Sequence, residues 1–148
     1  MYSNIKTGYF KYQQNDVLSL SKEEIIDRLL KALLSNIEHA ITAMKAGKIA
    51  IKGEKISRAI AIVGELRASL NFKDGGEIAE KLDMLYDYII RELLFANIKN
   101  DINQLKRVKK VIMPIVDAWS EIILKGQHQR DLKQALNQET YKQIQAAV

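Results

Sequence analysis

Apolar residues recur every three or four positions along most of this chain, which is the period of an amphipathic α-helix. Only one proline and seven glycines interrupt that period. A first helix is predicted from the capping box Ser21-Lys22-Glu23-Glu24, in which the serine hydroxyl and the second glutamate satisfy backbone N–H groups. This helix is expected to end near Lys45, because glycine at position 47 suits the left-handed conformation that often closes helices.

Three further helices follow from the same period. The second is predicted to begin after Gly53 and to end before the turn-forming run 71–76, and the third to cover residues 77–97. A short polar link, 99–101, then starts the fourth helix. Connections this short favour antiparallel neighbours, so the chain is predicted to be all-α, an antiparallel up-down four-helix bundle over residues 21–124.

Three segments depart from a plain four-helix pattern. Pro114 lies inside the fourth helix and is expected to kink or break it, because proline removes one hydrogen bond and clashes with the preceding turn. Residues 1–18 form an N-terminal arm before the first capping box. Residues 127–148 are rich in glutamine and keep only a sparse helical period, so they are predicted to form a short fifth helix that is loosely docked or depends on a partner.

The third helix is more apolar than a bundle helix needs to be. At 100° per residue its core face is expected to hold six residues: Ile78, Leu82, Leu85, Ile89, Leu93 and Ala96. A second stripe holds Met84, Tyr88 and Phe95. Either this helix is the most central one and is covered on all sides, or the second stripe is an exposed surface for a partner, since large apolar patches usually mark binding sites.

Length and composition narrow the class of protein. A chain of 148 residues suits one domain, residues 1–148, and 47% hydrophobic with 28% charged residues is a globular composition. The chain has no cysteine, which excludes disulfides and thiolate metal sites. Its start leads into no apolar run, and no stretch of about 18 apolar residues is present to span a membrane. A cytoplasmic protein without membrane insertion is therefore expected.

The sequence offers few groups for catalysis or metal binding. His39 and His128 are its only histidines, and neither has a second ligand at metal-binding spacing. Asp83 and Asp87 share one helical face, but a di-iron bundle site needs Glu-x-x-His pairs that are absent, so both are interpreted as solvated surface acids. No catalytic residue, cofactor or metal is predicted, and the protein is not expected to be an enzyme.

The net charge of +5 keeps one alternative open, a basic helical nucleic-acid-binding module. Its densest basic cluster comprises Lys106, Arg107, Lys109 and Lys110. However, the basic residues are spread along the chain and mixed with acidic ones, and neither interleaved aromatics nor a helix-turn-helix pattern accompanies them. A solvated face is favoured, and no nucleic acid is expected as a partner.

The N-terminal arm is rich in apolar side chains for a segment with little regular helical period. They are Ile5, Tyr9, Phe10, Tyr12, Val17 and Leu18. Such residues are expected to dock somewhere. The arm is interpreted either as a fixed seal over one end of the bundle or as a removable plug that occupies a binding groove until a partner displaces it.

Several short strings, in order along the chain, resemble the flagellar export chaperone FliS family. The similarity runs from about Tyr12 to Ile122. It is carried by YQQNDV (12–17), ELRASL (65–70), GGEIA (75–79), LYDY (85–88), ANIKND (96–101) and DAW (117–119). The family fold is an antiparallel helical bundle, which agrees with the periodicity. The tail from Gln127 has no counterpart in the family pattern.

The resemblance implies a chaperone that binds the disordered C-terminal segment of flagellin, prevents premature polymerisation and delivers it to the gate of the flagellar type III export apparatus. A co-chaperone or regulator is a further possible partner, through the bundle surface or the C-terminal tail. Tyr12 matches a tyrosine in the family segment that can lie over the flagellin groove. The expected contacts with the partner are Tyr9, Tyr12, Ile62, Leu66, Met84, Tyr88 and Phe95.

Overall fold

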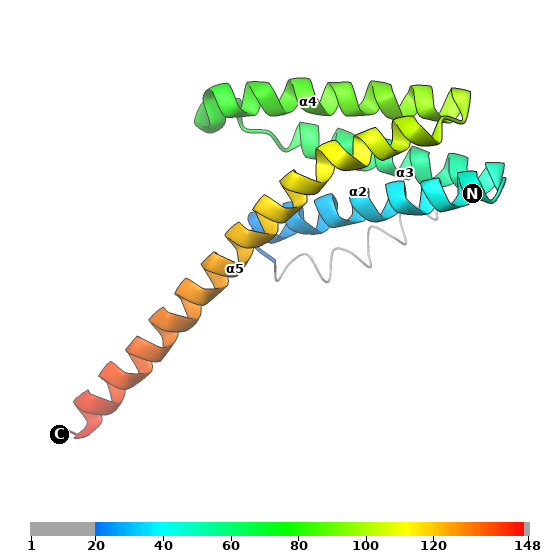
Figure 1. Cartoon of the computed structure of the whole chain (residues 1–148). Helices are drawn as coiled ribbons and strands as arrows, with labels where there is room; N and C mark the ends of the chain where they lie inside the picture. Colours follow the sequence, from blue (N-terminus) through cyan, green and yellow to red (C-terminus); the bar gives the residue numbers. More distant parts are fainter. Residues whose placement is uncertain (1–19, 147–148) are drawn as a thin grey trace, which may run out of the picture.

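Four α-helices make up the part of the chain that the structure describes. The computed structural model describes residues 20–146, apart from the side chain of Tyr141, so the N-terminal arm lies outside it. The helices are α2 (Lys22–Lys45), α3 (Ile49–Ala68), α4 (Phe72–Lys99) and α5 (Ile102–Ala146), and no strand occurs among these residues. In Figure 1, α2, α3 and α4 lie side by side, whereas α5 crosses them obliquely and extends beyond the bundle. The predicted all-α bundle is confirmed.

The core lies between all four helices. Each helix packs against the next in the chain, and α5 closes the bundle by packing against α2. Fully buried residues of α2, α3, α4 and α5 include Leu33, Ile37, Ile56, Val63, Ile89, Leu93, Leu105 and Ile112. Burying one such side chain stabilises a fold by about 1.5–3 kcal/mol, so this cluster supplies the main driving force for folding.

Local signals fix several helix ends where the sequence predicts them. The Ser21 hydroxyl accepts a hydrogen bond from the Glu24 N–H at 3.2 Å, which caps α2. Gly47 has φ +69 after the end of α2, a conformation that most side chains avoid. Gly76 has φ +49 and ψ −123, so the long regular part of α4 begins at Glu77, as predicted. The neighbour of Gly76, Gly75, lies against Ala79, and a Cβ added at Gly75 would come within 2.9 Å of the Ala79 Cβ.

The predicted start of the second helix is wrong. The helix α3 begins at Ile49 and runs through Gly53. Its first turn is fixed from outside by Lys52, which is buried and donates hydrogen bonds to the Asn97 carbonyl at 2.9 Å and to Asn100 Oδ1 at 2.6 Å. The lysine thereby satisfies a carbonyl at the end of α4, which would otherwise lack an intrahelical partner.

Residues 127–146 are helical as predicted, but they continue α5 and do not form a fifth helix. The helix α5 is continuous through Pro114 and Gly126, because extending an existing helix costs little once it is nucleated. Figure 1 shows α5 changing direction in its yellow part, which holds Pro114, so the proline kinks the helix without ending it. From residue 127 to residue 146 every described side chain is exposed. No helix within residues 20–146 is long and apolar enough to cross a membrane.

Replacing Lys52 by methionine is expected to destabilise the bundle by about 1–3 kcal/mol, because the substitution leaves the Asn97 carbonyl without its donor. Urea denaturation of both proteins measures this difference. The matched control is Lys48→Met, at an exposed position of the same segment, which is expected to change the unfolding free energy by less than about 0.5 kcal/mol. Equal effects of the two substitutions would contradict the structural role of Lys52.

Removing residues 127–148 is expected to change the unfolding free energy of the bundle by less than about 1 kcal/mol, because an exposed ion pair links this segment to α2 and such pairs contribute little to stability. That pair joins Arg130 Nη2 and Glu24 Oε1 at 3.4 Å. Urea denaturation of the full and shortened chains tests the expectation. A loss of several kcal/mol would mean that the projecting part of α5 is needed for folding.

Candidate functional site

The helix α4 is covered on its core side and on the edge that faces α3. Its core-facing residues Ile89, Leu93 and Ala96 are fully buried. On the α3 edge, Arg67 Nε donates to Asp83 Oδ1 at 2.6 Å, and Arg67 Nη1 lies 3.4 Å from Asp87 Oδ1. These ion pairs fix which edge of α4 faces α3.

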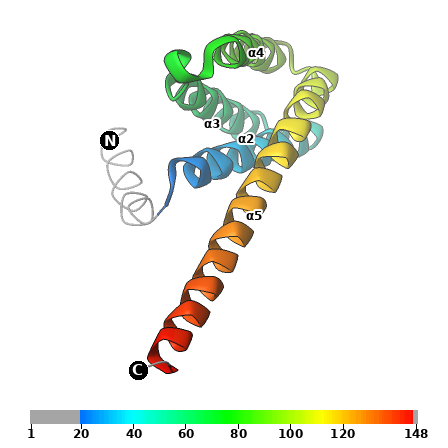
Figure 2. The ribbon, with the colours of Figure 1, turned by 90° about the vertical axis from the view of Figure 1, so that its left-hand side faces the viewer.

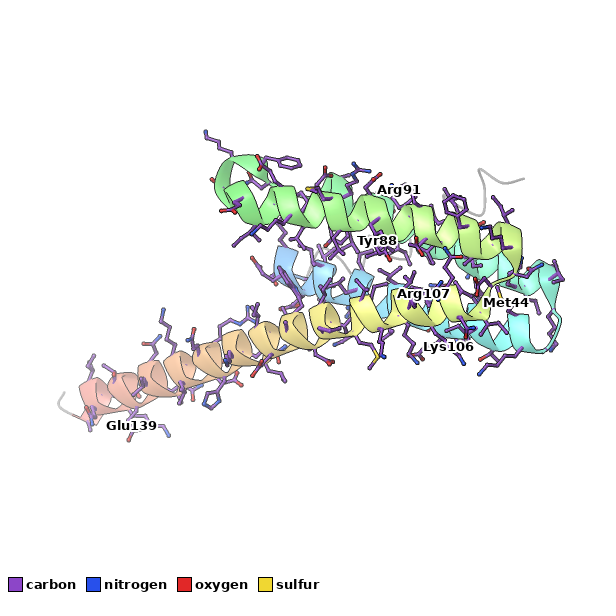
Figure 3. All side chains as sticks on the ribbon, turned by 45° about the horizontal axis from the view of Figure 1, so that its top comes forward. Met44, Tyr88, Arg91, Lys106, Arg107 and Glu139 are labelled. Carbon is purple, nitrogen blue, oxygen red and sulfur yellow. The ribbon has the colours of Figure 1, made fainter. Side chains whose placement is uncertain are left out.

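The other edge of α4 is covered by α5 only near one end. There Gln104 Nε2 donates a hydrogen bond to Glu92 Oε2 at 2.8 Å. Beyond that contact α5 separates from α4, and Figures 2 and 3 show the two helices diverging. In Figure 3, Tyr88 lies on the side of α4 that faces α5, one turn beyond Glu92. Neither neighbour covers the tyrosine completely.

The divergence follows from the contacts that α5 makes with α2. Along α5, Lys109 forms an ion pair with Glu38 at 3.6 Å, and the Ser120 hydroxyl donates to Asp27 Oδ1 at 3.2 Å. The Trp119 indole N–H donates to the backbone oxygen of Glu23 at 2.8 Å. Because α5 follows α2 over this length, it does not follow α4.

The uncovered side of α4 is therefore an apolar surface, which we call the α4 surface. It consists of Met84, Tyr88, Leu94, Phe95 and Ile98. Met84 is 72% exposed, Tyr88 39% and Phe95 49%. The alternative that this helix is covered on all sides is wrong, because these five side chains are exposed and, among the described helices, α4 packs mainly against α3 and α5. At about 100° per residue these side chains span roughly 120°, or about a third, of the helix circumference, on the side opposite the core.

The α4 surface carries little chemistry of its own. Its one polar side-chain atom among the five residues is the Tyr88 hydroxyl, and the Lys99 ammonium lies 5.4 Å from the centre of the Phe95 ring. Arg91 also lies on the outward side of α4, and its charge is paired with Asp87 at 3.1 Å. Such a surface suits burial of an apolar partner with an aromatic anchor at its centre.

The structure brings together three of the seven predicted contact residues, Met84, Tyr88 and Phe95. Ile62 is half-buried on α3. It precedes Arg67 by five residues, which places it about 140° away from the side of α3 that faces α4. Tyr9 and Tyr12 lie outside the described residues.

Two predicted positions need correction. Leu66 is 2% exposed and belongs to the core, because the inward side of α3 includes it. It is therefore not available as a partner contact. Ile78, near the start of α4, is 71% exposed although it was predicted to be a core residue. The exposed Ile98 was missed because the predicted helix ended at Asn97.

The two aspartates predicted to be solvated acids are instead partners of Arg67. The hydrogen bond with Asp83 is the main reason that the pKa of the Arg67 guanidinium is raised. Both aspartates thus link α3 to α4. Within residues 20–146, no group of three His, Cys, Asp or Glu side chains is placed to hold a metal ion.

Comparison with known proteins identifies the type of bundle. A family profile described as "Flagellar protein FliS" matches residues 5–126, which is most of the chain. The chain belongs to the FliS family. The match includes the whole α4 surface and ends near the point where α5 leaves the bundle.

Individual relatives agree with the FliS profile. The flagellar secretion chaperone FliS of Salmonella typhimurium is 37% identical over 117 residues, covering 78% of this chain and 87% of that protein. The protein of the same name from Vibrio cholerae is 36% identical over 116 residues, covering 78% and 85%. A crystal structure of a bacterial flagellar chaperone shares the fold, with a TM-score of 0.66 and 15% identity over 81% of this chain and 98% of that one.

The nucleic-acid alternative gains no support from these FliS relatives. Of its basic cluster, Lys109 is paired with Glu38, while Lys106, Arg107 and Lys110 are exposed.

The LYDY string (85–88) places its two tyrosines in opposite environments. Tyr86 is buried, and burial raises the pKa of its hydroxyl, whereas Tyr88 lies on the α4 surface. A raised pKa in the folded state means that the neutral phenol is favoured by folding. The contribution of the Tyr86 hydroxyl to the free energy of unfolding is present below the ordinary tyrosine pKa of about 10. It is lost as the pH rises through the pKa that the hydroxyl has in the folded state.

The unfolding free energy is therefore expected to fall above about pH 10, and Tyr86→Phe is expected to lack part of that decrease. Urea denaturation between about pH 9 and pH 11 compares the two proteins, and the difference between them isolates Tyr86 from other groups. Tyr88→Phe serves as the control and should follow the parent chain. Identical pH profiles for the parent and Tyr86→Phe would contradict this role of burial.

Proposed function

We propose that this protein is a flagellar secretion chaperone that binds the C-terminal segment of flagellin in the cytoplasm and delivers it to the flagellar type III export apparatus. Its action is physical, without a catalysed reaction or a cofactor. The observation that carries the proposal is the exposed apolar α4 surface in a bundle of the FliS family. Masking the flagellin segment prevents it from polymerising early.

The shape of the α4 surface suits an amphipathic helix. Tyr88 and Phe95 are seven residues apart, or about 10 Å along the helix axis. Met84 and Ile98 extend the surface to about 21 Å, or roughly four helical turns. A partner helix of similar length would present apolar residues at spacings of three, four and seven to these side chains.

Burial supplies the free energy of binding in this proposal. A segment that is disordered alone loses conformational entropy when it folds onto the bundle. Burial of apolar surface offsets this loss at about 25 cal/mol per Å². Because the five residues of the α4 surface carry no formal charge, binding there should depend weakly on salt.

The remaining partners in the proposal are the export gate and a co-chaperone or regulator. The projecting part of α5 offers them a separate surface, because it is exposed and lies beyond the family match. Its exposed apolar residues include Leu132, Leu136 and Ile144. Binding there would leave the α4 surface free for flagellin.

Tyr88→Ala is expected to weaken binding of a peptide from the last forty or so residues of flagellin by more than about 1 kcal/mol, because it removes a central aromatic anchor. Calorimetric titration measures the affinity, and a thermal scan of the free protein is expected to show a nearly unchanged Tm. Phe72→Ala is the matched control, since Phe72 is another exposed aromatic of α4 outside the α4 surface.

Two outcomes would count against the proposal in different ways. Unchanged affinity after Tyr88→Ala, with tight binding by the parent chain, would remove the α4 surface from the site but keep the function. No binding by the folded parent chain would remove flagellin as the client. Steeply salt-dependent binding to DNA or RNA by the parent chain would instead favour the nucleic-acid alternative.

A further inference from the structure

The positive charge of the protein is concentrated in two stretches of sequence. Residues 42–58 and 91–110 together contain eleven Lys and Arg but only three Asp and Glu, a net charge of +8. The whole chain has a net charge of +5, so the remaining residues together carry −3. Basic residues are therefore concentrated in these two stretches, although basic and acidic residues look evenly mixed along the sequence as a whole.

The two stretches meet at one end of the bundle. The end of α2, the start of α3, the end of α4 and the start of α5 all lie there. Lys52 ties the start of α3 to Asn97 and Asn100 at the end of α4. Figure 3 shows Lys106 and Arg107 of α5 at the same end as Met44 of α2. We call this region the basic end.

Most cations of the basic end point into solvent without an acidic partner. Among the described residues, no ion pair is formed by the exposed side chains of Lys45, Lys48, Lys106, Arg107 and Lys110. The three acids of these stretches are engaged in other contacts. Glu54 pairs with Arg58 at 2.8 Å, Glu92 accepts from Gln104, and Asp101 accepts from the Gln104 N–H at 3.1 Å.

Exposed isoleucines accompany these cations. Ile49, at the start of α3, is 55% exposed, and Ile98, near the end of α4, is 77% exposed. The basic residues are mainly lysines, eight of the eleven, which attract anionic headgroups as point charges. Lysines around protruding aliphatic side chains fit a lipid surface, where the charges meet headgroups and the isoleucines enter the interface. A nucleic-acid site would instead be expected to offer aromatic or arginine side chains on which bases can stack.

We propose that the basic end binds the surface of an anionic membrane, with the protein lying on the headgroups and not inserting a helix. The proposal does not depend on flagellin binding, since the exposed lysines and Ile49 on which it rests lie outside the α4 surface, although Ile98 belongs to both. The charge separation also orients the molecule, because the rest of the chain is net negative and is repelled by the same surface. The projecting part of α5 would then point away from the attachment end.

The test is sedimentation of the full chain with vesicles, one set of pure phosphatidylcholine and one with about a third phosphatidylglycerol, at about 0.1 M salt. Binding is expected only to the anionic vesicles. The variant Lys48→Glu, Lys106→Glu, Lys110→Glu is expected to bind on the order of a hundredfold more weakly, because three attractive charges become repulsive. Circular dichroism and the Tm establish that the variant is folded.

The matched control is Lys22→Glu, Lys133→Glu, Lys142→Glu, three exposed lysines away from the basic end. Both variants have a net charge of −1 in place of +5, so net charge alone predicts equal losses. Retention of binding by the control supports the proposal. Equal loss in both variants, no binding of the parent chain to anionic vesicles, or displacement from them by an equal charge concentration of duplex DNA would overturn it. If the parent chain sediments equally with both vesicle types, the proposal fails as well.

Discussion

The packing of α5 along α2 is the interaction on which the rest of the structure depends. Buried Val108, Ile112 and Val116 join the α2 core residues, and hydrogen bonds from Trp119 and Ser120 continue the contact to the first turn of α2. One helix cannot follow two neighbours whose axes differ. By following α2, α5 leaves most of one side of α4 without cover.

This arrangement separates stability from binding within a single helix. The inward residues Ile89, Leu93 and Ala96 are fully buried and hold α4 in the bundle. The outward residues Tyr88 and Phe95 belong to a surface that is not used for packing against α3 or α5. A chaperone of this kind must remain folded with and without its client, and the two sides of α4 allow both states. The Arg67 ion pairs with Asp83 and Asp87 keep the outward side oriented.

Sequence periodicity identified the elements whose ends are fixed by local chemistry, such as the Ser21 cap of α2. It failed where a distant contact decides, since the start of α3 depends on the hydrogen bond of Lys52 to Asn97, 45 residues away. The same limit applies to the site. Periodicity places Met84, Tyr88 and Phe95 on one stripe, but only the path of α5 leaves that stripe uncovered. Leu66 was misassigned because periodicity alone does not tell which stripe of α3 faces a neighbour.

The continuity of α5 has a mechanical consequence. The 45 residues of this helix span about 67 Å, and about 40 Å of that length lies between Trp119 and Ala146. If the helix moves as a stiff rod, a rotation of about 5° where it crosses α2 displaces its far end by about 3.5 Å. The projecting segment is thus a lever. A partner that binds its tip can therefore rotate α5 where it crosses α2. Such a rotation would change the width of the space beside α4.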